Sequence, residues 1–258
     1  MPNKNKNFPN KDLSIHFFVN GFSFCTQSKI DFIPSLKTSQ NFNKILKEYL
    51  EHYIKKSSDF VSIILFQNPS IFVPISFFDE SLSENYLGLF NKPKNYEIVS
   101  YDTLEEVNQV NIYSFPKSIR IAIEESKINF ELTHYNTLLY KKILELNSSN
   151  EFDYQLFIHF QSKAMDIFLL EKGNLIFNNR FLVTNEDEFL YYLFFIVEQF
   201  DIDTKDLELI FLGKIPYFKT YYQAVKQYHS HIKFVEKESS HNTDLSTHHA
   251  PYLAKNFS

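Results

Sequence analysis

The sequence is poor in the residues that build disulfides, metal sites and phosphate-binding loops. Its 258 residues include one cysteine, no tryptophan and only four glycines. A single cysteine excludes an internal disulfide and a metal site made of several cysteines, so a reducing compartment, the cytoplasm, is expected. Cys25 itself is predicted to be a buried, inert thiol, because it stands in an apolar strand with no histidine at a recognisable catalytic spacing.

An excess of positive charge and a long apolar run are also missing. The formal net charge is -5 and the lysines are spread among acidic residues, which argues against nucleic acid as the main partner. The most apolar stretch, residues 189–197, is less than half of the roughly 20 residues that a membrane-spanning helix needs. We therefore expect a buried helix there and no direct insertion into a membrane.

Both ends of the chain are polar. Residues 1–11 lack the apolar core of a secretory signal and are predicted to form a disordered tail. Residues 237–258 are predicted to form a polar C-terminal tail.

Hydrophobic spacing predicts a sheet with covering helices in the first half of the chain. Residues 13–33 alternate strand-like runs with turns, and the Asn20-Gly21 pair predicts a type I′ hairpin. From Ser39, apolar residues recur at helical spacing, which predicts an amphipathic helix. The continuous apolar run at 60–66 predicts a strand that is covered on both faces.

A polar region interrupts this order before it resumes. Residues 79–108 are polar and irregular, so an insertion or an exposed edge is predicted there. The elements predicted next are a strand at 110–115, a helix from Pro116, a strand at 127–132, and a helix that carries Leu138, Leu139, Ile143 and Leu146. The polar stretch at 146–153 is the predicted boundary between two lobes.

The second half repeats the order of the first. Its predicted elements are strands at 154–160, 165–170 and 174–182, a helix at 186–200, a strand at 207–212, an aromatic amphipathic helix at 218–228 and a short strand at 232–236. The repeat predicts an α/β fold of two duplicated lobes, residues 12–150 and 151–236. Each lobe should contain a mixed five-stranded sheet flanked by helices.

Three stretches, residues 110–143, 156–181 and 207–225, resemble the superfamily of actin, sugar kinases and heat-shock ATPases. Within it they are most similar in pattern to the actin-like protein of type IV pilus assembly. The resemblance implies an actin-like fold of two ribonuclease-H-like lobes. The opening "LSI" and "GFSF" segments also resemble an uncharacterised bacterial family, DUF3822, which implies no activity.

The resemblance also implies which residues should hold a nucleotide. In the hydrolysing relatives each lobe opens with Asp-x-Gly, where the carboxylate handles magnesium and the glycine admits phosphate. These positions align with His16-Phe17-Phe18 and His159-Phe160-Gln161, and the paired glycine below adenine survives only as Gly213-Lys214. The acids and glycines of both phosphate loops are therefore replaced, and we expect no catalytic residue, no cofactor and no metal.

Several residues leave two interpretations open. His16 and His159 could bind a metal or act as acid and base, although ordinary strand residues with local contacts are favoured. Lys214 could contact an anion, although a solvated loop lysine is the plainer account. The aromatic face at 218–228 could meet a partner, but core packing is favoured. The histidines near the C-terminus are His229, His231, His241, His248 and His249, and their irregular spacing favours incidental composition over a metal site.

Two classes of function follow from these observations. The favoured one is a non-catalytic actin-like module that binds another protein, such as the cytoplasmic tail of a membrane protein. The alternative is a divergent nucleotide-binding ATPase or phosphotransferase that uses unrecognised residues, supported only by the two-lobed architecture.

Overall fold

The protein divides into two compact units in a computed structural model. The structure describes residues 13–18, 20–26, 30–34, 39–53, 60–66, 68–90, 92–146, 151–161, 163–213 and 216–235. The predicted tails at 1–11 and 237–258 lie outside the described residues, as does Lys214. Unit 1 is Met1–Leu138 and unit 2 is Leu139–Phe257, so the division falls inside helix α4 (Tyr135–Leu146). The boundary expected at residue 150 from the repeat stays a prediction.

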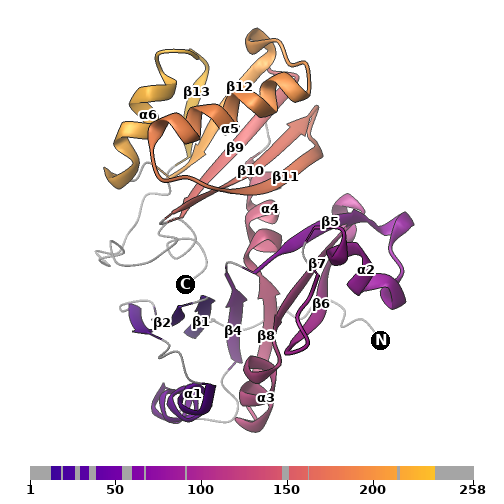
Figure 1. The fold of residues 1–258 in the computed structure, drawn as a ribbon, viewed down its shortest axis with the longest axis vertical. Coiled ribbons are helices and arrows are strands. Elements are labelled where there is room, and N and C mark those ends of the chain that lie inside the picture. The colour runs from indigo at the N-terminus through magenta and orange to yellow at the C-terminus, as the bar shows by residue number, and fades with distance from the viewer. Residues whose placement is uncertain are drawn as a thin grey trace. The chain divides into compact units, whose positions relative to one another are not determined.

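Unit 1 contains a mixed five-stranded sheet (Figure 1). Its elements are β1 (Leu13–Phe18), β2 (Gly21–Thr26), β3 (Ile30–Pro34), α1 (Ser39–Tyr53), β4 (Phe60–Leu65) and β8 (Asn129–His134). The strand order is β3-β2-β1-β4-β8, with β1 antiparallel to β2 and parallel to β4. The inner strand β4 is parallel to both of its neighbours, which confirms the covered strand predicted from its apolar run.

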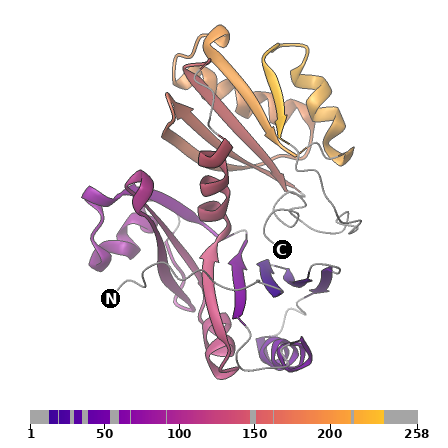
Figure 2. The same ribbon diagram turned by 180° about the vertical axis from the view of Figure 1, so that it is seen from behind.

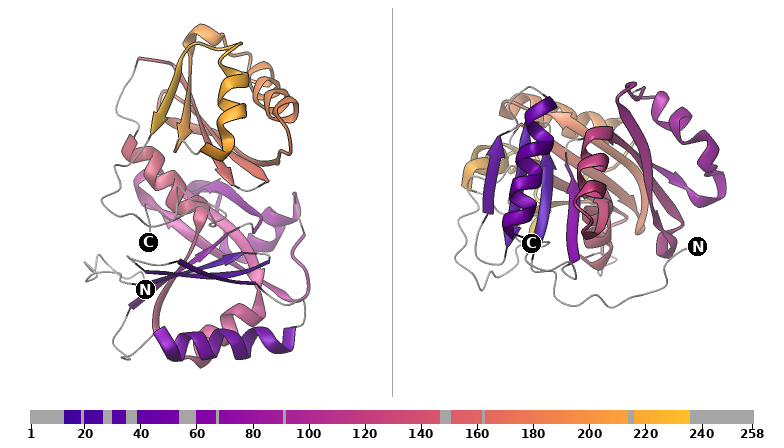
Figure 3. Two further views of the ribbon diagram at one scale, coloured as in Figure 1. Left: turned by 90° about the vertical axis from the view of Figure 1, so that its left-hand side faces the viewer. Right: turned by 90° about the horizontal axis from the view of Figure 1, so that it is seen from below.

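One face of this sheet packs on helices α1 and α3 (Lys117–Glu125), as Figure 3 shows for α1. Leu46 and Leu50 of α1 are buried beside Ile119 and Ile123 of α3. The opposite side of α1 carries the exposed Lys44 and its neighbours, so the amphipathic helix predicted from Ser39 is confirmed.

The first hairpin differs in detail from the prediction. Phe18 pairs directly with Gly21, and Gly21 is the first residue of β2. The type I′ turn centred on Asn20-Gly21 is therefore wrong. The glycine is needed for another reason, because a Cβ at Gly21 would lie 2.3 Å from the carbonyl oxygen of Ile33 on β3.

An ordered insertion lies between β4 and β8 and includes residues 79–108, the region predicted to be polar and irregular. It contains β5 (Ser70–Pro74), three short 3-10 turns, α2 (Ser83–Gly88), β6 (Glu97–Leu104) and β7 (Gln109–Pro116). These strands form a separate antiparallel sheet in the order β5-β7-β6. The expectation of irregular structure at 79–108 is thus wrong for α2 and β6. Sequence pattern missed β6 because nearly all of it is half-buried and its apolar residues do not alternate cleanly.

Unit 2 repeats the sheet of unit 1 (Figure 2). Its elements are β9 (Tyr154–Gln161), β10 (Ala164–Glu171), β11 (Asn174–Leu182), α5 (Glu186–Gln199), β12 (Leu207–Leu212), α6 (Lys219–Val225) and β13 (Ile232–Val235). The order β11-β10-β9-β12-β13 matches that of unit 1 strand for strand. The predicted α/β fold with two duplicated five-stranded lobes is confirmed.

Helices α5 and α6 cover one face of the second sheet. Leu193 and Ile196 of α5 pack with Phe218, Tyr222 and Val225 in one core. The aromatic face at 218–228 is therefore mainly core, as favoured, although Tyr228 is exposed. Among the described residues, no helix is both long and apolar enough to cross a membrane.

Candidate functional site

The two sheets place corresponding residues at the same register positions. The row in unit 1 consists of His16, Ser23 and Phe32 on β1, β2 and β3, and the row in unit 2 consists of His159, Asp166 and Arg180 on β9, β10 and β11. We call these the histidine rows. Two residues further along the first strand of each sheet stand Phe18 and Gln161, paired with Gly21 and Ala164. The expected Asp-x-Gly positions are thus equivalent in the two units, and their side chains differ.

In unit 1, His16 is completely buried and both ring nitrogens meet neutral groups. Nε2 lies 3.0 Å from Ser14 Oγ, and Nδ1 lies 3.5 Å from Cys25 Sγ. Burial raises the pKa of the Cys25 thiol to about 12, so the thiol keeps its proton at neutral pH and is a poor nucleophile. The buried thiol is confirmed. The hairpin brings a histidine beside it, which spacing along the chain did not reveal.

Phe18 belongs to an aromatic stack in unit 1. Its ring lies 4.8 Å from the ring of Phe66, which in turn stacks on Tyr135 at 5.4 Å. The ring of His16 lies 5.2 Å from that of Phe66. Phe18 and Phe66 are both buried, so packed rings fill the space beside this end of β1.

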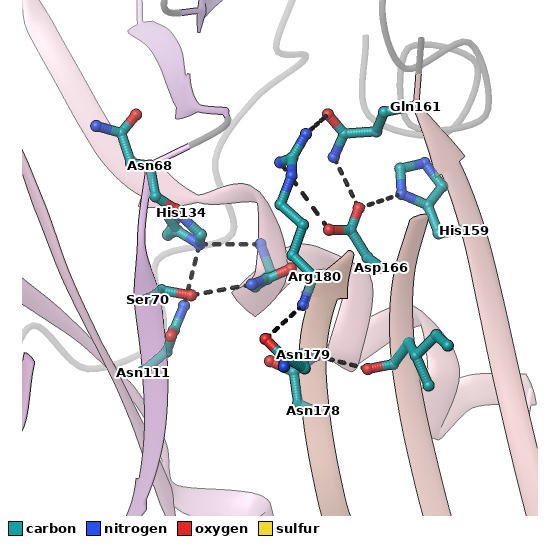
Figure 4. Close-up of polar contacts among 12 residues, drawn as sticks. Asn68, Ser70, Asn111, His134, His159, Gln161, Asp166, Asn178, Asn179 and Arg180 are labelled. Carbon is teal, nitrogen blue, oxygen red and sulfur yellow. Dashed lines mark hydrogen bonds and ion pairs between the residues drawn. The ribbon is translucent and has the colours of Figure 1, made fainter. Parts of the chain in front are cut away.

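In unit 2, the histidine row is an ionic cluster (Figure 4). His159 Nδ1 donates to Asp166 Oδ2 at 3.1 Å, and Gln161 Nε2 donates to the same oxygen at 2.7 Å. Arg180 Nη2 donates to Gln161 Oε1 at 3.1 Å, and Arg180 Nη1 lies 3.9 Å from Asp166 Oδ1. His159, Gln161 and Asp166 are each at most 1% exposed. Asp166 is therefore committed to three neighbouring side chains.

The remaining predicted positions have local contacts in unit 2. Gly213 adopts φ of 85°, its N–H donates to the Val235 carbonyl at 2.8 Å, and its carbonyl accepts from Tyr222 Oη at 3.3 Å. His229 is buried, its Nε2 donates to the Leu207 carbonyl at 3.0 Å, and burial lowers its pKa. His241, His248 and His249 lie outside the described residues, as Lys214 does.

A buried polar network in unit 1 was not predicted. His134, the last residue of β8, accepts the Asn136 N–H at Nδ1 and donates from Nε2 to the Asn68 carbonyl, so its ring is neutral with the proton on Nε2. Asn111 Nδ2 lies 3.3 Å from His134 Nδ1 (Figure 4) and donates to Thr137 Oγ1 at 2.9 Å. The signal in the sequence was a polar Asn111 inside the apolar run at 110–115.

Asp102 completes this network from the edge strand β6. Its Oδ2 accepts the His134 backbone N–H at 2.9 Å and the Thr137 hydroxyl at 2.6 Å, and its Oδ1 accepts the Tyr113 hydroxyl at 2.9 Å. Burial, and then the nearby Asp102 carboxylate, hold the pKa of Tyr113 well above its usual range. The network joins the insertion sheet to the junction of β8 and α4.

Comparison with known families and structures places this geometry in context. The DUF3822 family, described as "Protein of unknown function", matches residues 2–232. The chain belongs to the DUF3822 family. No curated protein matches this DUF3822 member significantly.

Two solved structures show the fold of this DUF3822 protein. A protein from Bacteroides thetaiotaomicron with an actin-like ATPase fold and unknown function has a TM-score of 0.71 and 21% identity, covering 87% of this chain and 91% of that chain. A chain of the PilM-PilN type IV pilus biogenesis complex has a TM-score of 0.53 and 10% identity, covering 95% of this chain and 96% of that chain. These likenesses show an actin-like fold, as the resemblance implied.

The fold family implies magnesium and a nucleotide, so the two histidine rows were tested for them. Magnesium prefers hard oxygen ligands, and among the described residues the β1–β2 hairpin contains neither aspartate nor glutamate. In unit 2 the carboxylate of Asp166 is already bound by His159, Gln161 and Arg180. Among described residues, no group of three or more His, Cys, Asp or Glu side chains is placed to hold a metal. The side chains at these positions do not fit a magnesium triphosphate.

Proposed function

We propose that this DUF3822 protein is a non-catalytic actin-like protein that serves as a binding or scaffold module for another protein in the bacterial cytoplasm. The observation that carries the proposal is the filling of both histidine rows. His16 and Phe18 are packed among neutral and aromatic groups in unit 1, and Asp166 is occupied by its own neighbours in unit 2. Chemistry on a phosphate would require ligands and space that these contacts use.

A protein partner is supported by the similar fold in a PilM-PilN complex. That likeness concerns the fold alone, and the step to this chain is part of the proposal. The cytoplasmic tail of a membrane protein is the partner class that we favour.

Isothermal titration calorimetry with the full chain tests the loss of nucleotide binding. We expect no saturable heat from ATP with magnesium at concentrations up to about 1 mM, which corresponds to less than about 4 kcal/mol of binding free energy. The same titration without magnesium is the control. Micromolar, magnesium-dependent binding would overturn the proposal and favour the alternative, a divergent ATPase or phosphotransferase. Any turnover found should then be measured again in His16→Ala and His159→Ala.

A further inference from the structure

Exposed apolar side chains concentrate on the insertion of unit 1. Phe77 is 74% exposed, Leu82 44%, and Leu89 and Phe90 77% each. Such side chains on a soluble protein are usually scattered singly, whereas a dense group commonly marks a contact surface. These four residues and Tyr86 lie within 14 consecutive positions on α2 and its flanking turns. We call them the insertion patch.

The members of the insertion patch lie on one surface. Leu82, Tyr86 and Phe90 are spaced by four residues across α2, with Leu82 at its N-cap and Phe90 two residues beyond its last residue. Leu89 directly precedes Phe90 and retains helical backbone angles. The Tyr86 hydroxyl donates to the Phe77 carbonyl and accepts the Asp79 N–H at 3.1 Å, so the loop that carries Phe77 is held against this face.

The patch stands on an ordered base. Leu87 of α2 is buried with Val73, Val110 and Ile112 in the core of the insertion, and the partly buried Tyr86 packs against the same core. Phe78 contacts the rings of Tyr86 at 6.3 Å and Tyr101 at 4.9 Å. The core of the insertion thus holds the backbone that carries the exposed side chains. This order reduces the conformational entropy lost when a partner binds.

Acidic residues surround the patch. Asp79, Glu80 and Glu84 lie within residues 77–90, and that stretch contains no Lys, Arg or His. All three acids are exposed. The N–H of Ile75, just before Phe77, donates to the carbonyl of Asn108 at 2.9 Å. Two more exposed acids, Glu105 and Glu106, stand just before Asn108 in the chain and therefore lie at the same end of the insertion sheet. The nearest lysines, Lys92 and Lys94, follow the patch in sequence.

We propose that the insertion patch docks a basic, apolar segment of another protein. This rests on the proposed function and names the surface and chemistry of its partner. Large apolar side chains of the segment would cover Phe77, Leu89 and Phe90, and its Lys or Arg side chains would meet the acidic rim. A second copy of this chain would bring the same acids against one another, and an anionic membrane surface would be repelled by them.

Unit 2 provides a matched control surface. Tyr191 and Phe195 of α5 are 63% and 42% exposed, and their rings stack at 6.0 Å. The exposed acids Asp187 and Glu198 lie on the same helix. Non-specific binding of a basic peptide would therefore use this surface as well, whereas specific docking on the insertion patch would not involve it.

The test measures fluorescence anisotropy of a synthetic 18-residue helical peptide of Leu and Lys, and of a twin with Glu in place of every Lys. We expect the full chain to bind the Lys peptide at least tenfold more tightly than the Glu peptide. The double variant Leu89→Ser with Phe90→Ser should weaken binding at least tenfold, and Phe77→Ser alone should weaken it severalfold. Glu80→Lys with Glu84→Lys should weaken binding and reduce its salt dependence, whereas Tyr191→Ser with Phe195→Ser should change it less than twofold.

Three outcomes would overturn the docking proposal. One is the absence of saturable binding to the Lys peptide, and another is an equal loss in the unit 2 control variant. The third is self-association or membrane binding through the patch. A dimer seen in light scattering that is lost in Leu89→Ser with Phe90→Ser would identify a second copy as the occupant. Flotation with anionic phosphatidylglycerol vesicles that is lost in the same variant would identify a membrane. Circular dichroism should show unchanged thermal midpoints, since the substituted side chains are exposed. Nucleotide binding would refute the proposed function without affecting these results.

Discussion

The two histidine rows fill the same position of a duplicated sheet with opposite chemistry. In unit 1, His16 meets a hydroxyl and a thiol and lies beside the Phe18–Phe66 aromatic stack. In unit 2, His159 meets the carboxylate of Asp166, which is also held by a glutamine and an arginine. Identical topology therefore does not dictate one solution. A neutral packed row and an ionic row both occupy the end of the first strand.

The energetic consequences of the two solutions should differ. The row in unit 1 depends on packing, so its contribution should change little with salt. The row in unit 2 depends on mutual compensation of buried polar groups, so removing Asp166 deprives His159, Gln161 and Arg180 of an acceptor. Substitutions that remove one contact from each row measure this contrast.

Phe66→Ala should have the largest effect. Phe66 is fully buried and its ring contacts those of His16, Phe18 and Tyr135, so the free energy of unfolding should fall by about 4 kcal/mol. Urea unfolding followed by tyrosine fluorescence and circular dichroism measures it, since the chain has no tryptophan. Phe77→Ala, at an exposed site, is the control. A decrease in the free energy of unfolding of less than about 1 kcal/mol would show that the aromatic stack does not hold the end of β1 together.

Asp166→Ala should have the next largest effect. It leaves Arg180, His159 and Gln161 without their shared acceptor, and breaking a buried ionic cluster in this way costs about 3 kcal/mol. The same urea experiment applies. The matched control is Asp153→Ala, whose carboxylate lies 3.6 Å from Lys172 with both side chains more than half exposed, and it should cost less than about 1 kcal/mol. Equal losses for both variants would contradict an ionic unit 2 row.

Cys25→Ala should have the smallest effect, and the part of it that depends on pH should appear only under alkaline conditions. The folded thiol has a pKa of about 12, raised from a reference value of 9.0. Stability from this group is therefore complete below about pH 9 and declines as pH rises toward 12, by at most ~1.4 kcal/mol per pH unit. The free energy of unfolding of the parent chain should fall faster between pH 8 and pH 10 than that of Cys25→Ala. Identical pH slopes would show that the thiol beside His16 is not buried.

Most of the architecture could be predicted from the sequence because it depends on local patterns. Helix α1 follows from apolar spacing after Ser39, and the duplication follows from repeated element order. The contents of the histidine rows could not be predicted, because the contact of Arg180 with Asp166 depends on the register of separate strands. The same holds for Cys25 and His16, which a hairpin brings together. In the insertion sheet, the strand predicted at 110–115 is β7, whereas β6 was missed because it lacks a clean alternating pattern.

The insertion between β4 and β8 also has a consequence for folding order. In unit 1, Phe60 of β4 pairs with Asn129 of β8, across the whole insertion, whereas in unit 2 Leu209 pairs with the much nearer Ile232. Closing the longer loop costs more chain entropy, and during synthesis one edge of β4 must wait until β8 has left the ribosome. Until β8 is available, this edge of β4 is exposed and can pair with a wrong strand. Nascent unit 1 should therefore depend on chaperones more than nascent unit 2.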